Sequence, residues 1–138
     1  MSESALAKKM KLKAGARAAV VNATTGYLKE LGPLPAGVEL FEKLQGRFDW
    51  IQGFVRTSAE LKGLVPRLVK ALAPESLLWI SFPKGTSGIQ TDLTRDKGWD
   101  ALKSVDLKWV TLISVNDTWS AFCLRPYKPG EAKQKTRR

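Results

Sequence analysis

The feature that most constrains the fold is a strand, helix, strand pattern between residues 48 and 88. The apolar run FDWIQGFV has the length of a strand, the segment from Ser58 to Leu72 has helical spacing, and LLWISF predicts another strand. Two strands joined by a helix pair in parallel. Parallel sheets are covered on both faces and place a binding crevice at the carboxyl ends of their strands. The pattern therefore predicts an α/β fold and the edge at which function is to be sought.

The N-terminal part of the chain predicts further strands of the same sheet. ARAAVV (16–21) is a β-rich apolar run, and the following segment, capped by Thr24 or Thr25, predicts a short helix that ends at Gly32. Residues 38–44 fit either a strand or one helical turn, and we take the strand.

The C-terminal part predicts one more helix and a hairpin. We expect a helix over residues 94–105, and Pro66 is expected to kink or split the helix before it. WVTLISV (109–115) and TWSAFCLRP (118–126) flank two turn residues and predict a β-hairpin. The fold class expected is α/β: a single-domain Rossmann-like sandwich with a mainly parallel sheet of about six strands, ending in an antiparallel hairpin.

The size of the chain allows one domain. With 138 residues, 43% of them hydrophobic, it can bury one ordinary core. We expect a basic N-terminal segment over 1–13, the α/β domain over 14–127 and a disordered basic tail over 128–138. The sequence has no apolar run of bilayer length, no secretory signal and a single cysteine, Cys123. These features predict a cytoplasmic protein with no membrane partner.

The net charge of +10 is concentrated at the two ends of the chain. Residues 1–13 carry +3, residues 128–138 carry +4, and the much longer body between them carries only +3. The simplest interpretation is that the ends are solvated. Weak, salt-sensitive and non-specific binding of nucleic acid through these tails is the alternative.

Several chemistries are excluded or disfavoured by residue type. The chain has no histidine, which removes histidine-dependent nucleophile systems and imidazole metal ligands. Cys123 lies between apolar residues of an expected strand and is interpreted as buried and inert. Asp92, Asp96 and Asp100 recur at helical spacing among basic residues, which favours a salt-bridged helix face over a metal site. We therefore assign no catalytic residue and no metal ligand.

Small polar and cationic residues follow the expected strands and are predicted to meet at one edge of the sheet. Hydroxyls, helix N-terminal amides and cations together are suited to an anionic small molecule or a nucleotide phosphate. Ordinary turn and cap chemistry is the alternative, and the identity of any cofactor stays open. The candidate ligand-binding residues are Asn22, Thr24, Thr25, Gly26, Arg56, Thr57, Ser58, Lys84, Gly85, Thr86, Ser87, Asn116 and Asp117.

The order of elements from residue 48 to residue 126 resembles the C-terminal half of the Rossmann-like methyltransferase fold. The chain as a whole also resembles a family of small bacterial proteins of unknown function, through KLKAGARAAVVNA, FDWIQGFV, LLWISFPKGTSG and NDTWSAFCLRP. The first resemblance implies a glycine-rich turn after the first strand, where backbone approaches S-adenosylmethionine. It also implies an acidic residue at the end of the second strand that binds the ribose, here Glu39 or Glu42.

The chain departs from that family pattern in its first loop and in its length. The loop NATTG (22–26) has one glycine, and the chain is short for the full set of strands and helices. The leading expectation is therefore a non-catalytic or accessory domain that binds an anionic small molecule at the crevice. The alternatives are a reduced S-adenosylmethionine-dependent methyltransferase-like enzyme and a partner-binding module that acts through basic tails.

Overall fold

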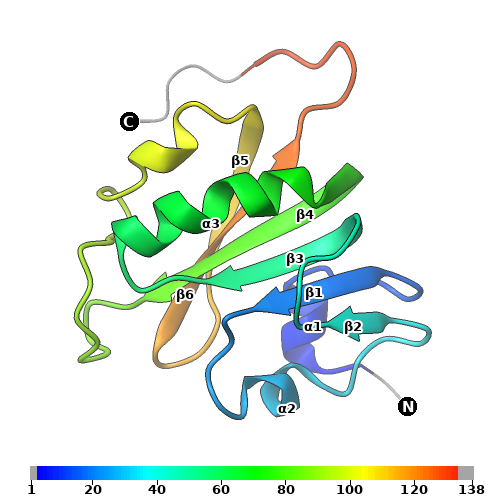
Figure 1. The fold of residues 1–138 in the computed structure, drawn as a ribbon. Coiled ribbons are helices and arrows are strands. Elements are labelled where there is room, and N and C mark those ends of the chain that lie inside the picture. The colour runs from blue at the N-terminus through cyan, green and yellow to red at the C-terminus, as the bar shows by residue number, and fades with distance from the viewer. Residues whose placement is uncertain (1–2, 134–138) are drawn as a thin grey trace.

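Six strands form one sheet in the computed structural model, which describes residues 3–133 (Figure 1). The order across the sheet is β2-β1-β3-β4-β6-β5. The first four of these strands run parallel, whereas β6 is antiparallel to both β4 and β5. This arrangement confirms the α/β fold class with a mainly parallel sheet and an antiparallel end pair. The strands are β1 (Arg17–Val21), β2 (Glu39–Phe41), β3 (Phe48–Phe54), β4 (Leu72–Pro83), β5 (Leu107–Ser114) and β6 (Trp119–Pro126).

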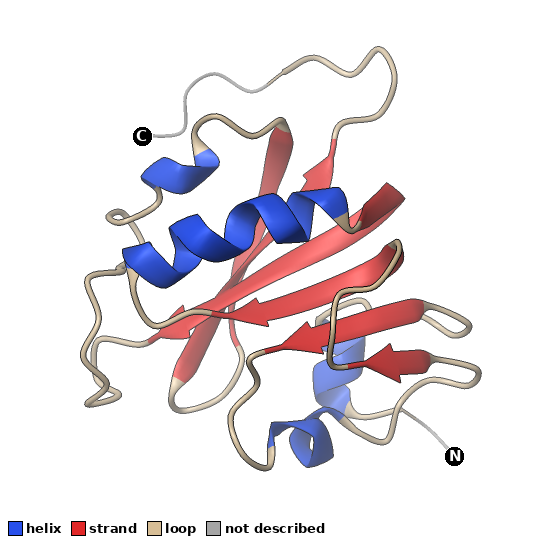
Figure 2. Cartoon of the chain, in the orientation of Figure 1, coloured by secondary structure: helices blue, strands red, loops and turns tan. Residues whose placement is uncertain are grey.

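Helix α3 (Ser58–Lys70) covers one face of the sheet (Figure 2). Its apolar side chains, Leu61, Leu64, Val65 and Leu68, are buried against the sheet because they recur at helical spacing. The expected split at Pro66 is absent, and the helix continues through it. Pro66 has no N–H to donate to the carbonyl of residue 62, but residues 62 and 66 both lie on the exposed side of the helix, so the missing hydrogen bond is not in the core.

Two short helices, α1 (Ala5–Lys9) and α2 (Tyr27–Leu31), lie on the other face of the sheet. The indole N–H groups of Trp50 and Trp79 both donate to the carbonyl oxygen of Met10, at 2.8 and 3.0 Å. The segment expected to be a basic N-terminal extension thus contributes fully buried side chains, Met10 among them, to this layer. No helix within residues 3–133 has the length and apolar character to cross a membrane.

The prediction of a helix over residues 94–105 is wrong. This region holds only the 3-10 helix η1 (Asp100–Leu102). The hydroxyl of Thr94 accepts the backbone N–H groups of residues 96 and 97, and the Trp99 indole donates to the Thr94 carbonyl at 2.6 Å. Gly98 has a φ of 97°, which no right-handed helix allows. Local side-chain hydrogen bonds and this left-handed residue therefore replace the helical ladder.

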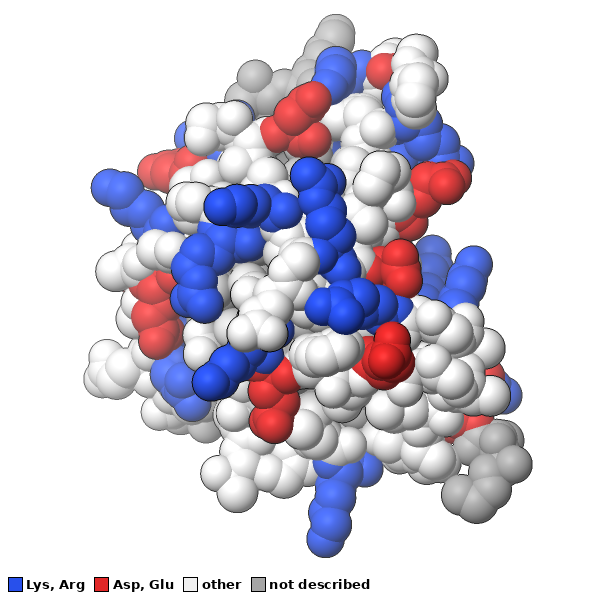
Figure 3. Space-filling view, turned by 45° about the vertical axis from the view of Figure 1, so that its right-hand side comes forward, with Lys and Arg blue, Asp and Glu red and all other residues white. Residues whose placement is uncertain are grey.

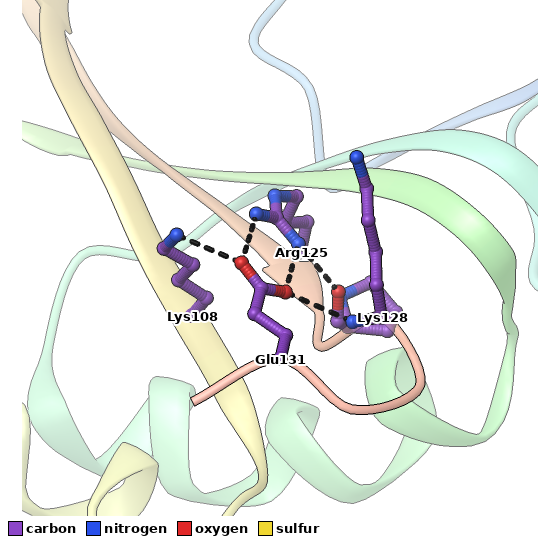
Figure 4. A network of polar contacts seen from close by, with 5 residues as sticks. Lys108, Arg125, Lys128 and Glu131 are labelled. Carbon is purple, nitrogen blue, oxygen red and sulfur yellow. Dashed lines mark hydrogen bonds and ion pairs between the residues drawn. The ribbon is translucent and has the colours of Figure 1, made fainter. Parts of the chain in front are cut away.

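The C-terminal segment, expected to be disordered from residue 128, is described as far as Lys133, and Glu131 holds it against the hairpin. Its carboxylate accepts two hydrogen bonds from the Arg125 guanidinium, at 2.9 and 2.7 Å, and one from Lys108, at 2.9 Å (Figure 4). The backbone N–H of Lys128 also donates to it, at 2.9 Å. The Arg125 contact first, and then the others, hold the pKa of Glu131 well below its usual range.

Candidate functional site

The parallel strands end along one edge of the sheet, and the loops that follow them lie side by side there. The pairing of Ala19 with Phe41, and of Val21 with Gly53, places the carboxyl ends of β2, β1 and β3 next to one another. The pairing of Phe54 with Ser81 adds the end of β4 to this edge. The topology therefore gathers the loops that begin at residues 22, 42, 55 and 84, as a parallel sheet requires.

The loop after β1 makes a tight turn into α2. Asn22 and Gly26 both adopt left-handed conformations, with φ of 60° and 84°. The Thr24 carbonyl accepts the N–H of Tyr27 at 3.0 Å, which starts α2. Asparagine and glycine are the residues that adopt this conformation at least cost, so the sequence of the turn suits its geometry. Thr25 lies within the same turn and is exposed.

A buried chain of side chains fixes α2, and with it this turn, to the centre of the sheet. The Tyr27 hydroxyl donates to the side-chain oxygen of Gln52 at 2.6 Å, and the Gln52 amide donates to the Ser81 hydroxyl at 2.9 Å. Burial is the main reason that the pKa of Tyr27 lies above its usual value. Sequence reasoning missed this chain of hydrogen bonds. Its signal was two polar residues, Gln52 and Ser81, inside otherwise apolar strands.

The polar groups of the residues between β3 and α3 are used in hydrogen bonds at the start of the helix. The Thr57 hydroxyl accepts the N–H of Glu60 at 3.1 Å, and the Glu60 carboxylate accepts the N–H of Arg56 at 2.5 Å. Ser58 donates its N–H to Asp92 at 2.7 Å and also its hydroxyl, and these hydrogen bonds lower the pKa of Asp92. Thr57 and Ser58 thus have the ordinary capping and loop-fixing roles. The Arg56 side chain extends over the Trp119 ring, with its Cζ atom 5.6 Å from the ring centroid.

Lys84 lies at the carboxyl edge, as expected, but its ammonium is tethered to the hairpin. The ammonium donates to the Ser114 hydroxyl at 2.6 Å, and the Lys84 backbone N–H donates to the Thr118 carbonyl at 2.8 Å. The Lys84 carbonyl accepts the N–H of Ser87 at 3.0 Å, which closes a turn over Gly85 and Thr86. These hydrogen bonds join the loop after β4 to the β5–β6 turn.

Asn116 joins that turn to α2. Its side-chain oxygen accepts the N–H groups of Thr118 and Trp119, both at 2.9 Å, and its amide donates to Glu30 at 2.8 Å. Asp117 beside it is exposed. The hairpin turn therefore meets the loops of the parallel strands. Three residues that were not predicted from the sequence, Glu30, Ser114 and Trp119, belong to this cluster.

The two glutamates of the second strand segment, Glu39 and Glu42, lie at opposite ends of β2. Glu39 begins β2 and is paired with Arg17, at the end of the sheet opposite to the loops. Glu42 follows Phe41 directly, at the carboxyl end of β2, and its side chain is exposed. Of the two residues that the family resemblance left open, Glu42 alone lies at the carboxyl edge of the sheet, directly after the pair of Phe41 with Ala19, and β1 ends two residues beyond Ala19. Across residues 3–133 no group of acidic and cysteine side chains is arranged to hold a metal ion.

Comparison with solved structures places this architecture. The chain superposes with a TM-score of 0.58 on ribosomal protein L11 methylase from Lactobacillus delbrueckii subsp. bulgaricus, at 15% identity, covering 88% of this chain and 75% of that one. The DhpI–SAH complex gives 0.61 at 10% identity, with 88% and 82% covered. A TehB-like SAM-dependent methyltransferase from Corynebacterium glutamicum gives 0.55 at 11% identity, with 83% and 82% covered. The fold is the Rossmann-like methyltransferase fold.

These comparisons correct the leading expectation from the sequence. A non-catalytic or accessory domain is contradicted, because solved structures that share the fold include several methyltransferases, and the methyltransferase-like alternative is favoured. No family model matches the chain, so no comparison of its sequence with family models supports the resemblance to small bacterial proteins of unknown function. No curated protein matches by sequence either.

Proposed function

We propose that this chain is an S-adenosylmethionine-binding, methyltransferase-like protein whose cofactor lies at the carboxyl edge of β1 and β2. The observation that carries the proposal is the position of Glu42. It places a carboxylate directly after β2, at the edge of the sheet where the neighbouring strand β1 ends and the turn of residues 22–26 begins. The methyltransferase fold supports the same edge, because ligands of open parallel sheets bind there.

The residues at this edge fit the cofactor in two respects. The exposed carboxylate of Glu42 would accept hydrogen bonds from the two ribose hydroxyls. A Cβ atom built on Gly26 would meet nothing within 4 Å, so the open side of the turn leaves room for a ligand close to the backbone. The single glycine means that this close approach is confined to one position of the turn. When bound, S-adenosylmethionine supplies an electrophilic methyl group.

The chain itself supplies the rigidity of this edge. Tyr27 holds α2, and thus the turn before it, to Gln52 of β3. The Asn116–Glu30 hydrogen bond holds the same helix to the hairpin turn. Side chains fixed in this way lose little freedom when a ligand binds, and less of the binding free energy is spent on ordering.

Titration with S-adenosylmethionine and with S-adenosylhomocysteine, followed by amide NMR and calorimetry, tests the proposal. We expect shifts in residues 22–26 and 42–44. Glu42→Gln should weaken binding about ten-fold or more, since a hydrogen bond to a charged group contributes about 1.5–3 kcal/mol. Glu39→Gln, at the opposite end of the same strand, is the matched control and should leave the affinity unchanged. Absence of shifts at millimolar cofactor, or equal losses in both variants, would refute the proposal.

A further inference from the structure

The exposed face of α3 carries three cations with no counter-ion. Lys62, Arg67 and Lys70 are exposed, and within residues 3–133 none of their side chains forms an ion pair or a hydrogen bond. The one acidic residue of the helix, Glu60, is at its first turn and accepts a backbone N–H. Figure 3 shows Lys and Arg side chains gathered over the face that includes this helix. The charge is thus concentrated in a folded element and does not belong only to the ends of the chain.

The surface around these cations is hollowed on both sides of the helix. A groove of about 940 Å³ runs between α3 and η1, with Lys62, Pro66 and Lys70 on its helix side. Its one carboxylate, Asp100, is already paired with Lys103 at 3.0 Å. A second hollow, of about 380 Å³, lies on the other side and contains Arg47, Arg67 and Lys70. The cations of α3 therefore lie on a ridge between two hollows. Most residues that line the first hollow are apolar or small, and Arg47 adds a further cation to the second.

Small residues also lie between the cations along this ridge. Ala59, Gly63 and Pro66 are exposed along it, and a Cβ atom built on Gly63 would meet nothing within 4 Å. An exposed glycine in a helix interior is destabilising relative to alanine, and here no packing interaction requires it. The small residues allow a partner to approach the helix backbone between the cations.

We propose that this face of α3 binds the phosphodiester backbone of a nucleic-acid strand. Lys62 and Lys70 are eight residues apart, about 12 Å along the helix axis, so the three cations can contact more than one phosphate of the same strand. The only large exposed apolar side chains within residues 3–133, Val110 and Leu112, lie on β5. After Glu60 in the first turn, the exposed side chains along α3 are thus cationic or small. They include no large apolar anchor of the kind that a membrane-inserting or protein-binding surface uses, and they fit a hydrophilic polyanion. The cations meet phosphates, so binding is independent of base sequence. This inference does not depend on cofactor binding.

The test uses the full chain and two probes, a 20-nucleotide oligo(U) RNA and an oligo(dT) DNA, each labelled for fluorescence anisotropy. The triple variant Lys62→Gln, Arg67→Gln, Lys70→Gln should weaken binding at least ten-fold at 50 mM salt. It should also reduce the slope of log affinity against log salt by about two, because each phosphate of a single strand that a cation neutralises contributes about 0.7 to that slope. Preference for one probe identifies RNA or DNA as the source of the phosphates, and either supports the proposal.

The matched control is Lys8→Gln, Lys13→Gln, Lys29→Gln, which removes the same charge away from α3 and should weaken binding less than three-fold. A second variant, Gly63→Leu, keeps every charge and should still weaken binding at least three-fold by blocking the ridge. Equal losses in the two triple variants, no effect of Gly63→Leu, or no binding by the parent chain would overturn the proposal. So would binding to anionic vesicles or to polyglutamate with the same dependence on the three α3 cations.

Discussion

At the scale of single residues, the buried Tyr27–Gln52–Ser81 chain is the feature with the clearest energetic consequence. Tyr27→Phe removes the donor at 2.6 Å from the Gln52 oxygen and leaves that oxygen buried without its partner. We expect the free energy of unfolding to fall by about 1–3 kcal/mol, the cost of an unsatisfied buried acceptor. Urea denaturation measures the loss. The double variant Tyr27→Phe, Gln52→Leu should recover part of it, and a single variant as stable as the parent would contradict the prediction.

Residue types in the sequence were enough to predict where some residues of the candidate site lie, but not which side chains they contact. Polar residues at strand ends correctly located Lys84 and Asn116 at the carboxyl edge. Their partners, Ser114 and Glu30, lie 30 and 86 residues away in the sequence. Such pairings depend on strand order, which the sequence did not specify. Gln52 was hidden for a related reason: an isolated polar residue in an apolar strand has no interpretation until the side chain opposite it is known.

At the scale of elements, two glycines have opposite roles. Gly63 lies on the exposed face of α3 with open space around it, so Gly63→Ala should raise the free energy of unfolding by about 0.5–1 kcal/mol through helix propensity. Gly98 has a φ of 97°, and a Cβ atom there would lie 2.6 Å from Leu93 Cδ2 and 3.1 Å from the Asp92 carbonyl oxygen. Gly98→Ala should therefore destabilise the protein by about 1 kcal/mol or more. Thermal denaturation of both variants measures the contrast, which two changes of the same sign would refute.

The same two segments show why some elements were predictable and others were not. Leu61, Leu64, Val65 and Leu68 give α3 a periodic apolar face, and that pattern outweighed the proline within the helix. Residues 94–105 also contain helix formers, but the hydrogen bonds of Thr94 and the conformation of Gly98 decide the local backbone. A periodic pattern supported by burial is reliable, whereas a polar segment depends on competing local hydrogen bonds.

The attachment of the C-terminal segment to the hairpin makes stability depend on pH. Arg125, followed by the Lys128 N–H and Lys108, lowers the pKa of Glu131 in the folded protein. The stabilisation by Glu131 is therefore complete above the unfolded value of about 4.3 and disappears as the pH falls from there toward the lower folded value. The difference in Tm between the parent and Glu131→Gln should be constant from pH 7 to about 5 and shrink below about 4.3. A difference that persists unchanged to pH 3 would show that the carboxylate charge is not responsible.

At the scale of the whole molecule, the distribution of charge and the limits of the folded unit have to be considered together. Because the sequence places most of the net charge at the two ends, charge counting alone would make residues 129–138 dispensable for stability. The structure adds two facts that charge counting does not contain. Glu131 binds Arg125 of β6, and three unpaired cations belong to α3. The sheet order also assembles from pairings such as Trp79 with Cys123, which no local pattern specifies.

Two shortened chains separate these contributions. A chain that ends at residue 133 keeps Glu131 and the Lys133–Asp106 ion pair while it removes Lys135, Arg137 and Arg138, so its free energy of unfolding should stay within about 0.5 kcal/mol of the parent. A chain that ends at residue 128 leaves Lys108 and Arg125 on adjacent strands without their shared carboxylate, and its Tm should be lower. Differential scanning calorimetry at pH 7 measures both. If the chain ending at residue 128 melts with the parent, Glu131 does not stabilise the fold, and the folded unit ends with β6.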